Sequence, residues 1–187
     1  MILGATEDAF KSVTRLNLIL IALVIIGLDW WTKYLVQTRM ALHQTISLPV
    51  DFVQLTYVHN YGGAFGIFAH QRLFFVLAAA VAIGGILYFF REISQLGKLS
   101  FWAGALILGG AIGNLIDRLR WGYVVDFIDL RWWPVFNVAD IALTVGVSLM
   151  FIELVWVGAH PPAEEKREGA EEGAKVAEEA PKAEEAT

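Results

Sequence analysis

The sequence predicts an all-α polytopic membrane protein with four transmembrane helices, a small extracytoplasmic β-sheet, and a surface loop or helix between helices 3 and 4. Three observations lead to this prediction. Of the 187 residues, 57% are hydrophobic and 18% are charged, and the mean hydropathy is +0.56, whereas soluble domains average about 45–50% apolar and 25% charged residues. Two stretches of eighteen residues, 73–90 and 99–116, carry no charge. Ionisable residues gather at the ends of apolar segments.

The four helices are expected over residues 16–36, 73–90, 99–118 and 138–159. A spanning helix needs roughly 20 mostly apolar residues. The first apolar run, 16–28, is too short to cross alone, so its helix must continue to about residue 36 and carry Asp29 and Lys33. A cleavable signal peptide is disfavoured there, because no small-residue cleavage site follows the run.

The remaining segments differ in composition from the helices. Residues 46–68 are rich in β-branched and aromatic side chains and alternate in places, which predicts a small antiparallel sheet on the membrane surface, since extended backbone cannot face lipid hydrocarbon. Residues 161–187 form an acidic Ala/Glu/Lys tail that lacks the apolar content to fold. The domains are thus an N-terminal segment 1–15, a membrane domain 16–160 and a disordered tail 161–187.

Charge and composition exclude several kinds of chemistry. The tail holds nine acidic and four basic residues, so the first 160 residues balance at ten of each, which leaves no basic surplus for nucleic-acid binding. The absence of cysteine excludes disulfides and thiol nucleophiles. The four histidines show no HExxH-type spacing, and we expect neither a metal nor another cofactor.

Polar residues concentrate at one face of the predicted bundle. A charge at the bilayer centre costs about 2.5–3.5 kcal/mol on insertion scales, so such residues are candidates for function. They are Asp29, Lys33, Asn60, Asn114, Asp117, Arg118, Asp126, Asn137 and Asp140. One polar site at that face explains them all.

Two of these acids can form a catalytic pair. Asp126 lies in the connection that returns from helix 3 to helix 4, and Asp140 lies near the start of helix 4, so both come back to one membrane level. Two carboxyl groups at hydrogen-bonding distance share one proton near neutral pH. That is the state in which an aspartic peptidase activates water and protonates the peptide carbonyl.

Five sequence blocks resemble the ordered motifs of bacterial lipoprotein signal peptidases, the signal peptidase II family. The blocks are Asp-Trp-Trp-Thr-Lys at 29–33, Asn-Tyr-Gly-Gly-Ala-Phe at 60–65, Gly-Gly-Ala-Ile-Gly-Asn-Leu-Ile-Asp-Arg at 109–118, Val-Val-Asp-Phe-Ile at 124–128 and Phe-Asn-Val-Ala-Asp at 136–140. The resemblance covers the membrane domain and omits the first dozen residues and the tail.

The resemblance implies a four-helix aspartic endopeptidase of the bacterial inner membrane, with both termini cytoplasmic and its site near the periplasmic surface. It would act as a monomer in membrane lipid, without a cofactor, on prolipoproteins whose cysteine carries diacylglycerol. Cleavage would fall just before that cysteine. The numbers of Lys and Arg on the two sides are nearly equal and do not fix the orientation independently.

The resemblance also assigns roles to residues. Asp126 and Asp140 match the catalytic aspartates. The substrate-binding positions are Asn60, Gly62, Asn114, Arg118 and Asn137. The structural or orienting positions are Asp29, Lys33, Gly110 and Asp117. Because the family commonly has one glycine before Ala-Phe, the pair Gly62-Gly63 leaves open which of the two fills that position.

Structural interpretations of the same residues stay open. Asn137 and Asp140 have the spacing of a helix N-cap with an acid in its first turn. Asp29 and Lys33 are spaced i, i+4 and can form an ion pair. Arg118 can pair with Asp117, reach lipid phosphates or bind substrate. The glycines of helix 3 have small-xxx-small spacings typical of close helix packing.

Two other functions compete with the aspartic peptidase. Ser47 and Lys33 could serve as the nucleophile and base of a Ser/Lys peptidase. Alternatively, the aspartates could carry protons in a small transporter or pair helices in a scaffold. No inverted repeat is visible, and the polar residues gather at one face instead of mid-depth.

Overall fold

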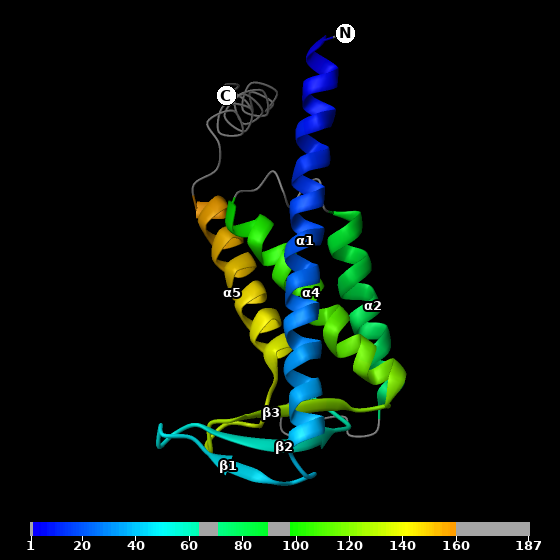
Figure 1. Ribbon diagram of the computed structural model, residues 1–187. Coiled ribbons are helices and arrows are strands. Elements are labelled where there is room, and N and C mark those ends of the chain that lie inside the picture. The colour runs from blue at the N-terminus through cyan, green and yellow to red at the C-terminus, as the bar shows by residue number, and fades with distance from the viewer. Residues whose placement is uncertain (1, 64–70, 90–97, 160–187) are drawn as a thin grey trace, which may run out of the picture.

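The computed structural model describes residues 2–63, 71–89 and 98–159 of the chain (Figure 1). The tail 161–187 and the end of the predicted sheet segment, 64–68, lie outside these residues. The elements in chain order are α1 (Ile2–Arg39), β1 (Thr45–Ser47), β2 (Gln54–Asn60), α2 (Arg72–Tyr88), α4 (Lys98–Arg120), β3 (Val124–Asp129) and α5 (Val138–Ala159).

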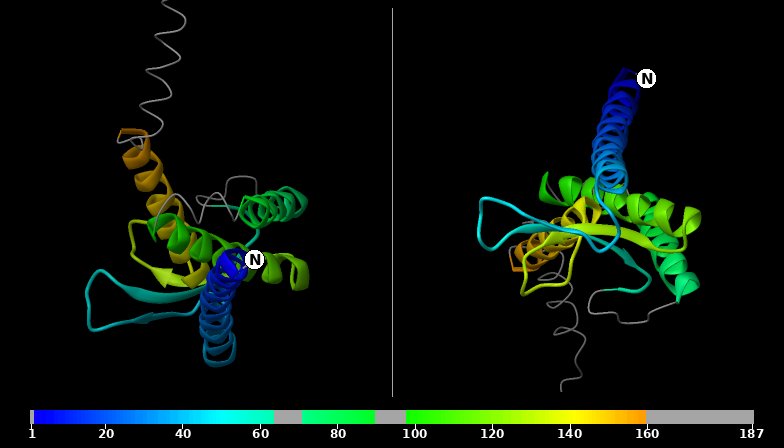
Figure 2. Two further views of the ribbon diagram at one scale, coloured as in Figure 1. Left: turned by 90° about the horizontal axis from the view of Figure 1, so that it is seen from above. Right: turned by 60° about the horizontal axis from the view of Figure 1, so that its bottom comes forward.

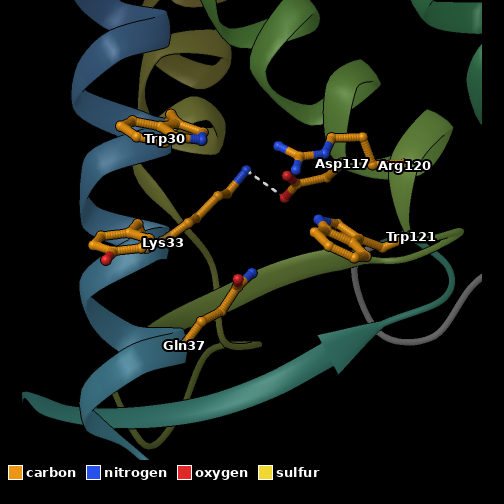
Figure 3. A pocket seen from close by; sticks show the side chains of 7 residues that line it. Trp30, Lys33, Gln37, Asp117, Arg120 and Trp121 are labelled. Atoms are coloured by element: carbon orange, nitrogen blue, oxygen red, sulfur yellow. Dashed lines mark ion pairs between the residues drawn. The ribbon is translucent and has the colours of Figure 1, made fainter.

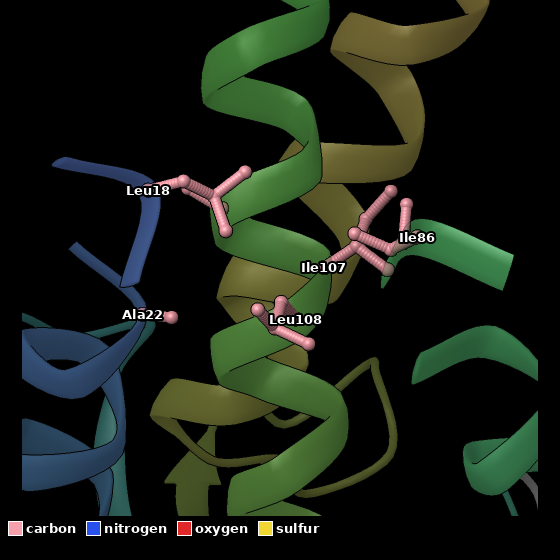
Figure 4. Close-up of a cluster of buried hydrophobic side chains, with 6 residues drawn as sticks. Leu18, Ala22, Ile86, Ile107 and Leu108 are labelled. Atoms are coloured by element: carbon pink, nitrogen blue, oxygen red, sulfur yellow. The ribbon is translucent and has the colours of Figure 1, made fainter. Parts of the chain in front are cut away.

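The helix α4 is the centre of the bundle. It crosses between α1, α2 and α5 and contacts all three (Figures 1 and 2). Apolar side chains from α1 and α2 meet it in a buried cluster (Figure 4). The members of this cluster are Leu18, Ala22, Ile86, Ala105, Ile107 and Leu108. Most apolar side chains of α4 are therefore buried or half-buried against the other helices. The helices α1, α2 and α5 instead expose many large apolar side chains.

The predicted helical segments are helical within the described residues, except that α2 ends at Tyr88 and leaves Phe89 outside the helix. Three helices are long and apolar enough to cross a membrane in that part of the chain, namely 16–39 of α1, α4, and 138–156 of α5. The described part of α2 has 17 residues, about 26 Å at 1.5 Å per residue, slightly less than a bilayer core of about 30 Å. The helix α1 begins at Ile2 instead of residue 16, and the preceding residues hold no proline that would end a helix there.

The connection between α4 and α5 differs from the predicted surface loop or helix, because it contains the strand β3. β1, β2 and β3 form one antiparallel sheet in that order. Gly122, at φ +82°, follows the end of α4 at Arg120, and this left-handed residue lets the chain turn into β3. The pairing partner of β3 lies more than sixty residues earlier in the chain, so a local pattern does not reveal it.

The sheet lies at one end of the bundle, opposite the N-terminal end of α1 (Figures 1 and 2). A cluster of Val36, Met40, Tyr57, Val125 and Phe127 joins it to the end of α1. The sheet therefore fixes the chain between α4 and α5 relative to α1.

Glycines on α4 permit the close helix packing that their spacing predicts. A Cβ at Gly109 would lie 2.8 Å from Cβ of Ile25 on α1. On another side of α4, a Cβ at Gly110 would lie 2.5 Å from the backbone oxygen of Ala139 on α5. Gly110 thus sets the distance between α4 and the start of α5.

We predict that Gly110→Ala destabilises the protein by about 1–3 kcal/mol, because α5 must move away from the added methyl group. The matched control is Gly84→Ala on α2, whose Cβ would meet nothing within 4 Å. That change should be neutral or stabilising by about 0.5–1 kcal/mol, since alanine favours helix. Thermal unfolding in detergent measures both, and equal midpoints for the two variants would contradict this account of α4 packing.

Candidate active site

Asp126 and Asp140 line the same cavity at the sheet end of the bundle. Asp126 lies on β3 and Asp140 in the first turn of α5. The cavity has a volume of about 220 Å³, and Asn60, Gly62 and Arg118 also line it. We call it the Asp126–Asp140 cavity. The structure thus brings together the two predicted carboxylates although fourteen positions separate them.

The carboxyl group of Asp126 is buried between two asparagine amides. The Asn60 amide donates to Oδ2 at 2.8 Å, and the Asn137 amide donates to Oδ1 at 2.7 Å. Asp126 is only 1% exposed. Burial and then the negative charge of Asp140 raise the pKa of Asp126 from 3.8 to about 7, against the two amide hydrogen bonds, which lower it. A proton therefore stays on this residue at pH values where an exposed aspartate is ionised.

Asp140 is held by the N-terminal cap of α5. The Asn137 side-chain oxygen accepts the Asp140 backbone N–H at 2.9 Å, and Asp140 Oδ2 accepts the Asn137 backbone N–H at 3.2 Å. This reciprocal pair is a capping box with an aspartate in place of the usual Glu or Gln. The predicted N-cap is confirmed, and it orients a side chain of the site.

Asn114 joins Asp140 to the interior of the bundle. Its amide nitrogen donates to Asp140 Oδ1 at 2.7 Å. Its oxygen accepts from the Asn137 amide and from the Lys33 ammonium, each at 3.1 Å. Because both neighbours are donors, the oxygen of Asn114 must face them and the amide nitrogen must face Asp140.

The ammonium group of Lys33 is the buried cation of this end of the bundle. It pairs with Asp29 at 2.7 Å and with Asp117 at 2.9 Å, and its side chain is 3% exposed. The predicted Asp29–Lys33 pair is therefore confirmed. Each carboxylate also holds backbone: Asp29 accepts the N–H of Ala139 at 3.0 Å, and Asp117 accepts the N–H of Val125 at 3.2 Å. The triad ties α1 to α4, α5 and β3.

Arg118 turns into the Asp126–Asp140 cavity and away from Asp117, which pairs with Lys33 instead. Its guanidinium donates to the Gly62 carbonyl at 3.2 Å and lies 4.6 Å from the centroid of the Phe75 ring. The Gly62 N–H in turn donates to the side-chain oxygen of Asn60 at 2.9 Å. Of the two adjacent glycines, Gly62 is the one whose backbone is hydrogen-bonded to both Asn60 and Arg118.

The sequence-based prediction did not include Asp129, the last residue of β3, whose side chain binds β2. It accepts hydrogen bonds from Gln54 at 2.6 Å, from Thr56 at 2.7 Å and from the backbone of Arg131 at 2.7 Å. Burial alone would raise the pKa of Asp129, but these bonds outweigh burial and hold that pKa below 3.8. A second acid three residues after Asp126 in an apolar strand was the available signal.

An apolar pocket adjoins the Asp126–Asp140 cavity and shares Trp133, Phe136, Asp140 and Thr144 with it. Its volume is about 350 Å³, and Trp132 and Ile141 also line it. Polar and apolar binding surfaces therefore meet at the carboxyl group of Asp140.

The alternative Ser/Lys pair is not assembled. Ser47 is exposed on β1, whereas the ammonium of Lys33 is buried and donates to Asp29, Asp117 and Asn114. Among the described residues, no hydrogen bond joins the hydroxyl of Ser47 to the ammonium of Lys33, which is occupied by its three partners.

Comparison with known proteins gives one consistent result. The family model described as signal peptidase (SPase) II matches residues 21–156. A protein of Symbiobacterium thermophilum named lipoprotein signal peptidase is 49% identical over 143 residues, which cover 74% of this chain and 94% of that protein. A lipoprotein signal peptidase of Moorella thermoacetica is 43% identical over 150 residues, covering 80% of this chain and 97% of its own length.

A solved structure gives the same result for the fold. It is described as a bacterial membrane enzyme determined by the in meso method at 2.3 Å resolution, and it aligns with a TM-score of 0.74 at 34% sequence identity. The alignment covers 79% of this chain and 92% of that one.

We predict that Lys33→Met destabilises the protein by about 3–5 kcal/mol, because it leaves two buried carboxylates without their cation. Adding Asp29→Asn to Lys33→Met should recover part of the loss, since one of those carboxylates is then neutral. The free energy of unfolding in detergent measures both effects.

Arg39→Gln is the control for this measurement, because Arg39 is an exposed cation at the end of the same helix. Its effect should stay within about 0.5 kcal/mol. A Lys33→Met protein as stable as Arg39→Gln would show that the triad contributes little.

Proposed function

The chain belongs to the signal peptidase II family, and from this membership we propose that it is an aspartic endopeptidase that cleaves diacylglyceryl-modified prolipoproteins just before the lipidated cysteine. Its family removes signal peptides from prolipoproteins. The observation that carries the aspartic mechanism is the position of Asp126 and Asp140 in one cavity, joined through Asn137.

We assign the shared proton to Asp126 and the negative charge to Asp140. Asp140 lies in the first turn of α5, where the helix dipole favours an anion. Asp126 lies on a strand, without such a dipole, and its pKa of about 7 keeps it protonated up to neutral pH. Asn137 contacts both carboxyl groups and holds them in a fixed relation.

Hydrolysis would then follow in two steps. Asp140 removes a proton from a water molecule as the water oxygen bonds to the peptide carbonyl carbon, and Asp126 gives its proton to the carbonyl oxygen. The resulting tetrahedral diol collapses when Asp140 gives its proton to the peptide nitrogen, Asp126 takes a proton from one diol hydroxyl, the C=O bond re-forms and the C–N bond breaks. The products are the free carboxyl end of the signal peptide and the free amino group of the lipidated cysteine, and the aspartates return to their starting state.

The surroundings of the dyad suit a lipid-modified substrate. The apolar pocket beside Asp140 can receive a lipid chain or an apolar residue of the signal peptide. Acyl chains stay in the bilayer at about 0.8 kcal/mol per buried methylene, which holds the modified cysteine at a constant depth. In the proposed topology α2 crosses the membrane together with the three longer helices, which gives four spans. Both termini are then cytoplasmic, and the sheet lies at the periplasmic surface of the inner membrane.

We predict that Asp126→Asn and Asp140→Asn each lower the cleavage rate by at least about 10²-fold, because each removes a proton-transfer group. Gel-shift cleavage of a purified diacylglyceryl-modified precursor measures the rate. Thermal unfolding must show that both variants remain folded.

Two controls accompany this assay. Asp51→Asn changes an exposed aspartate of the β1–β2 loop and should keep the wild-type rate. Ser47→Ala should also keep it, because no nucleophilic serine is required. Turnover retained by either dyad variant, or lost in Ser47→Ala, would count against the aspartic mechanism.

The cleavage rate should fall as the pH rises through about 7. The raised pKa of Asp126 means that its proton is present below about pH 7 and is lost above it, and with that proton the general acid is lost. The Asn60 amide lowers this pKa, so Asn60→Ala should move the alkaline limb to higher pH. A kcat/KM profile over pH 5–9 tests both statements, and a profile that stays flat across neutral pH would rule out this proton assignment.

A further inference from the structure

We propose that a second pocket, between α1 and the end of α4, binds the phosphate group of an anionic membrane phospholipid. This α1–α4 pocket has a volume of about 240 Å³, room for about eight water molecules and therefore for a glycerophosphate headgroup. It is lined by Trp30, Lys33, Tyr34, Gln37, Asp117, Arg120 and Trp121 (Figure 3). The proposal concerns binding and does not depend on the peptidase mechanism.

The polar lining of the pocket consists mostly of hydrogen-bond donors. The indoles of Trp30 and Trp121 and the amide of Gln37 can donate, as can the Arg120 guanidinium. Asp117 is the one acid of the lining, and its Oδ2 is already engaged by Lys33 and by the backbone of Val125. The charge of Lys33 is balanced by Asp29 and Asp117, so Arg120 is the cation of the lining that can pair with a phosphodiester.

Arg120 is the cation that remains available for a ligand. Lys33 directs its ammonium to Asp29, Asp117 and Asn114, which uses its three donors. Arg120 instead lies 4.9 Å from the centroid of the Trp121 ring, and it makes no ion pair or hydrogen bond with any described residue. A guanidinium with its fork unengaged is suited to bidentate contact with phosphate oxygens.

The aromatic residues around the pocket are of the kind that lie at the depth of lipid headgroups. Trp30, Tyr34 and Trp121 are each about half exposed, and the rings of Trp30 and Tyr34 stack at 5.7 Å. Such aromatic side chains mark the boundary between hydrocarbon and headgroups. The exposed side chains of α1 between Ile19 and Leu28 are apolar. The acyl chains of a lipid can therefore lie along this part of α1 while its phosphate enters the pocket.

The α1–α4 pocket is distinct from the Asp126–Asp140 cavity, since the two share no lining residue. They are connected through the triad, because Lys33 and Asp117 line the pocket and Lys33 also contacts Asn114 (Figure 3). A bound phosphate would thus lie beside the ion pair that orders the site.

Lipid retention by the purified full-length protein tests the proposal directly. The protein in a mild detergent is titrated with phosphatidylglycerol, and the bound lipid is counted by native mass spectrometry. Diacylglycerol with the same acyl chains serves as the ligand without phosphate. Arg120→Gln should weaken phosphatidylglycerol binding about tenfold, the loss expected for one charge-assisted contact, and should leave diacylglycerol binding unchanged. Arg120→Lys, which keeps the charge without the fork, should fall between.

Matched controls separate this pocket from general attraction of anionic lipid. Arg39→Gln removes an exposed cation at the same end of α1 and outside the pocket, so it should bind phosphatidylglycerol as the wild type does. Equal losses in Arg39→Gln and Arg120→Gln would overturn the proposal. Free glycerol phosphate should not displace the lipid at equal concentration, and displacement would show that the pocket takes a soluble phosphate compound instead.

Discussion

The ion pairs of the buried Lys33 ammonium are the interaction on which the sheet end of the bundle depends. The ammonium pairs with both Asp29 and Asp117 and fixes the amide of Asn114. Through these partners it holds the first turn of α5, by way of Ala139, and the start of β3, by way of Val125. Gly113 permits this arrangement, because a Cβ there would lie 2.8 Å from Asp29 Oδ2. Two buried carboxylates without this cation would be strongly unfavourable, so α1 must stay in contact with α4.

A second constraint is the sheet, which delivers Asp126. The strand β3 pairs with β2 so that Val58 lies opposite Asp126 and Asn60 opposite Val124. The register shifts between Leu55 and Val58, and Asp129 accepts hydrogen bonds from Gln54, before the shift, and from Thr56, within it. Side-chain hydrogen bonds between β2 and β3 thus lie on both sides of the shift, from Gln54 to Asp129 and from Asn60 to Asp126. Asn60 and Asp126 arrive at the cavity from neighbouring strands, with their side chains in contact.

The polar side chains form one connected network rather than a set of separate pairs. Asn137 donates to Asp126 and to Asn114, and Asn114 donates to Asp140. Each amide has one orientation that satisfies all its neighbours, and a network of that kind rigidifies a buried site. The same residues that cap α5 and join helices therefore also position both carboxyl groups. A division into structural and functional residues does not hold here, since Asn137 is the N-cap of α5 and the link between the aspartates.

The sequence by itself determined the features that depend on neighbours in the chain. Apolar runs predicted the helices, the spacing of Asp29 and Lys33 predicted their ion pair, and the spacing of Asn137 and Asp140 predicted the cap, because one helical turn brings such residues together. The family motifs named Asp126 and Asp140. Tertiary structure alone decided that Asp117 faces Lys33 while Arg118 faces Gly62, that β3 joins the sheet, and that Arg120 is left beside an open pocket. Those outcomes depend on which surfaces of α1, α4 and the sheet come into contact, and the packing of distant segments sets that choice.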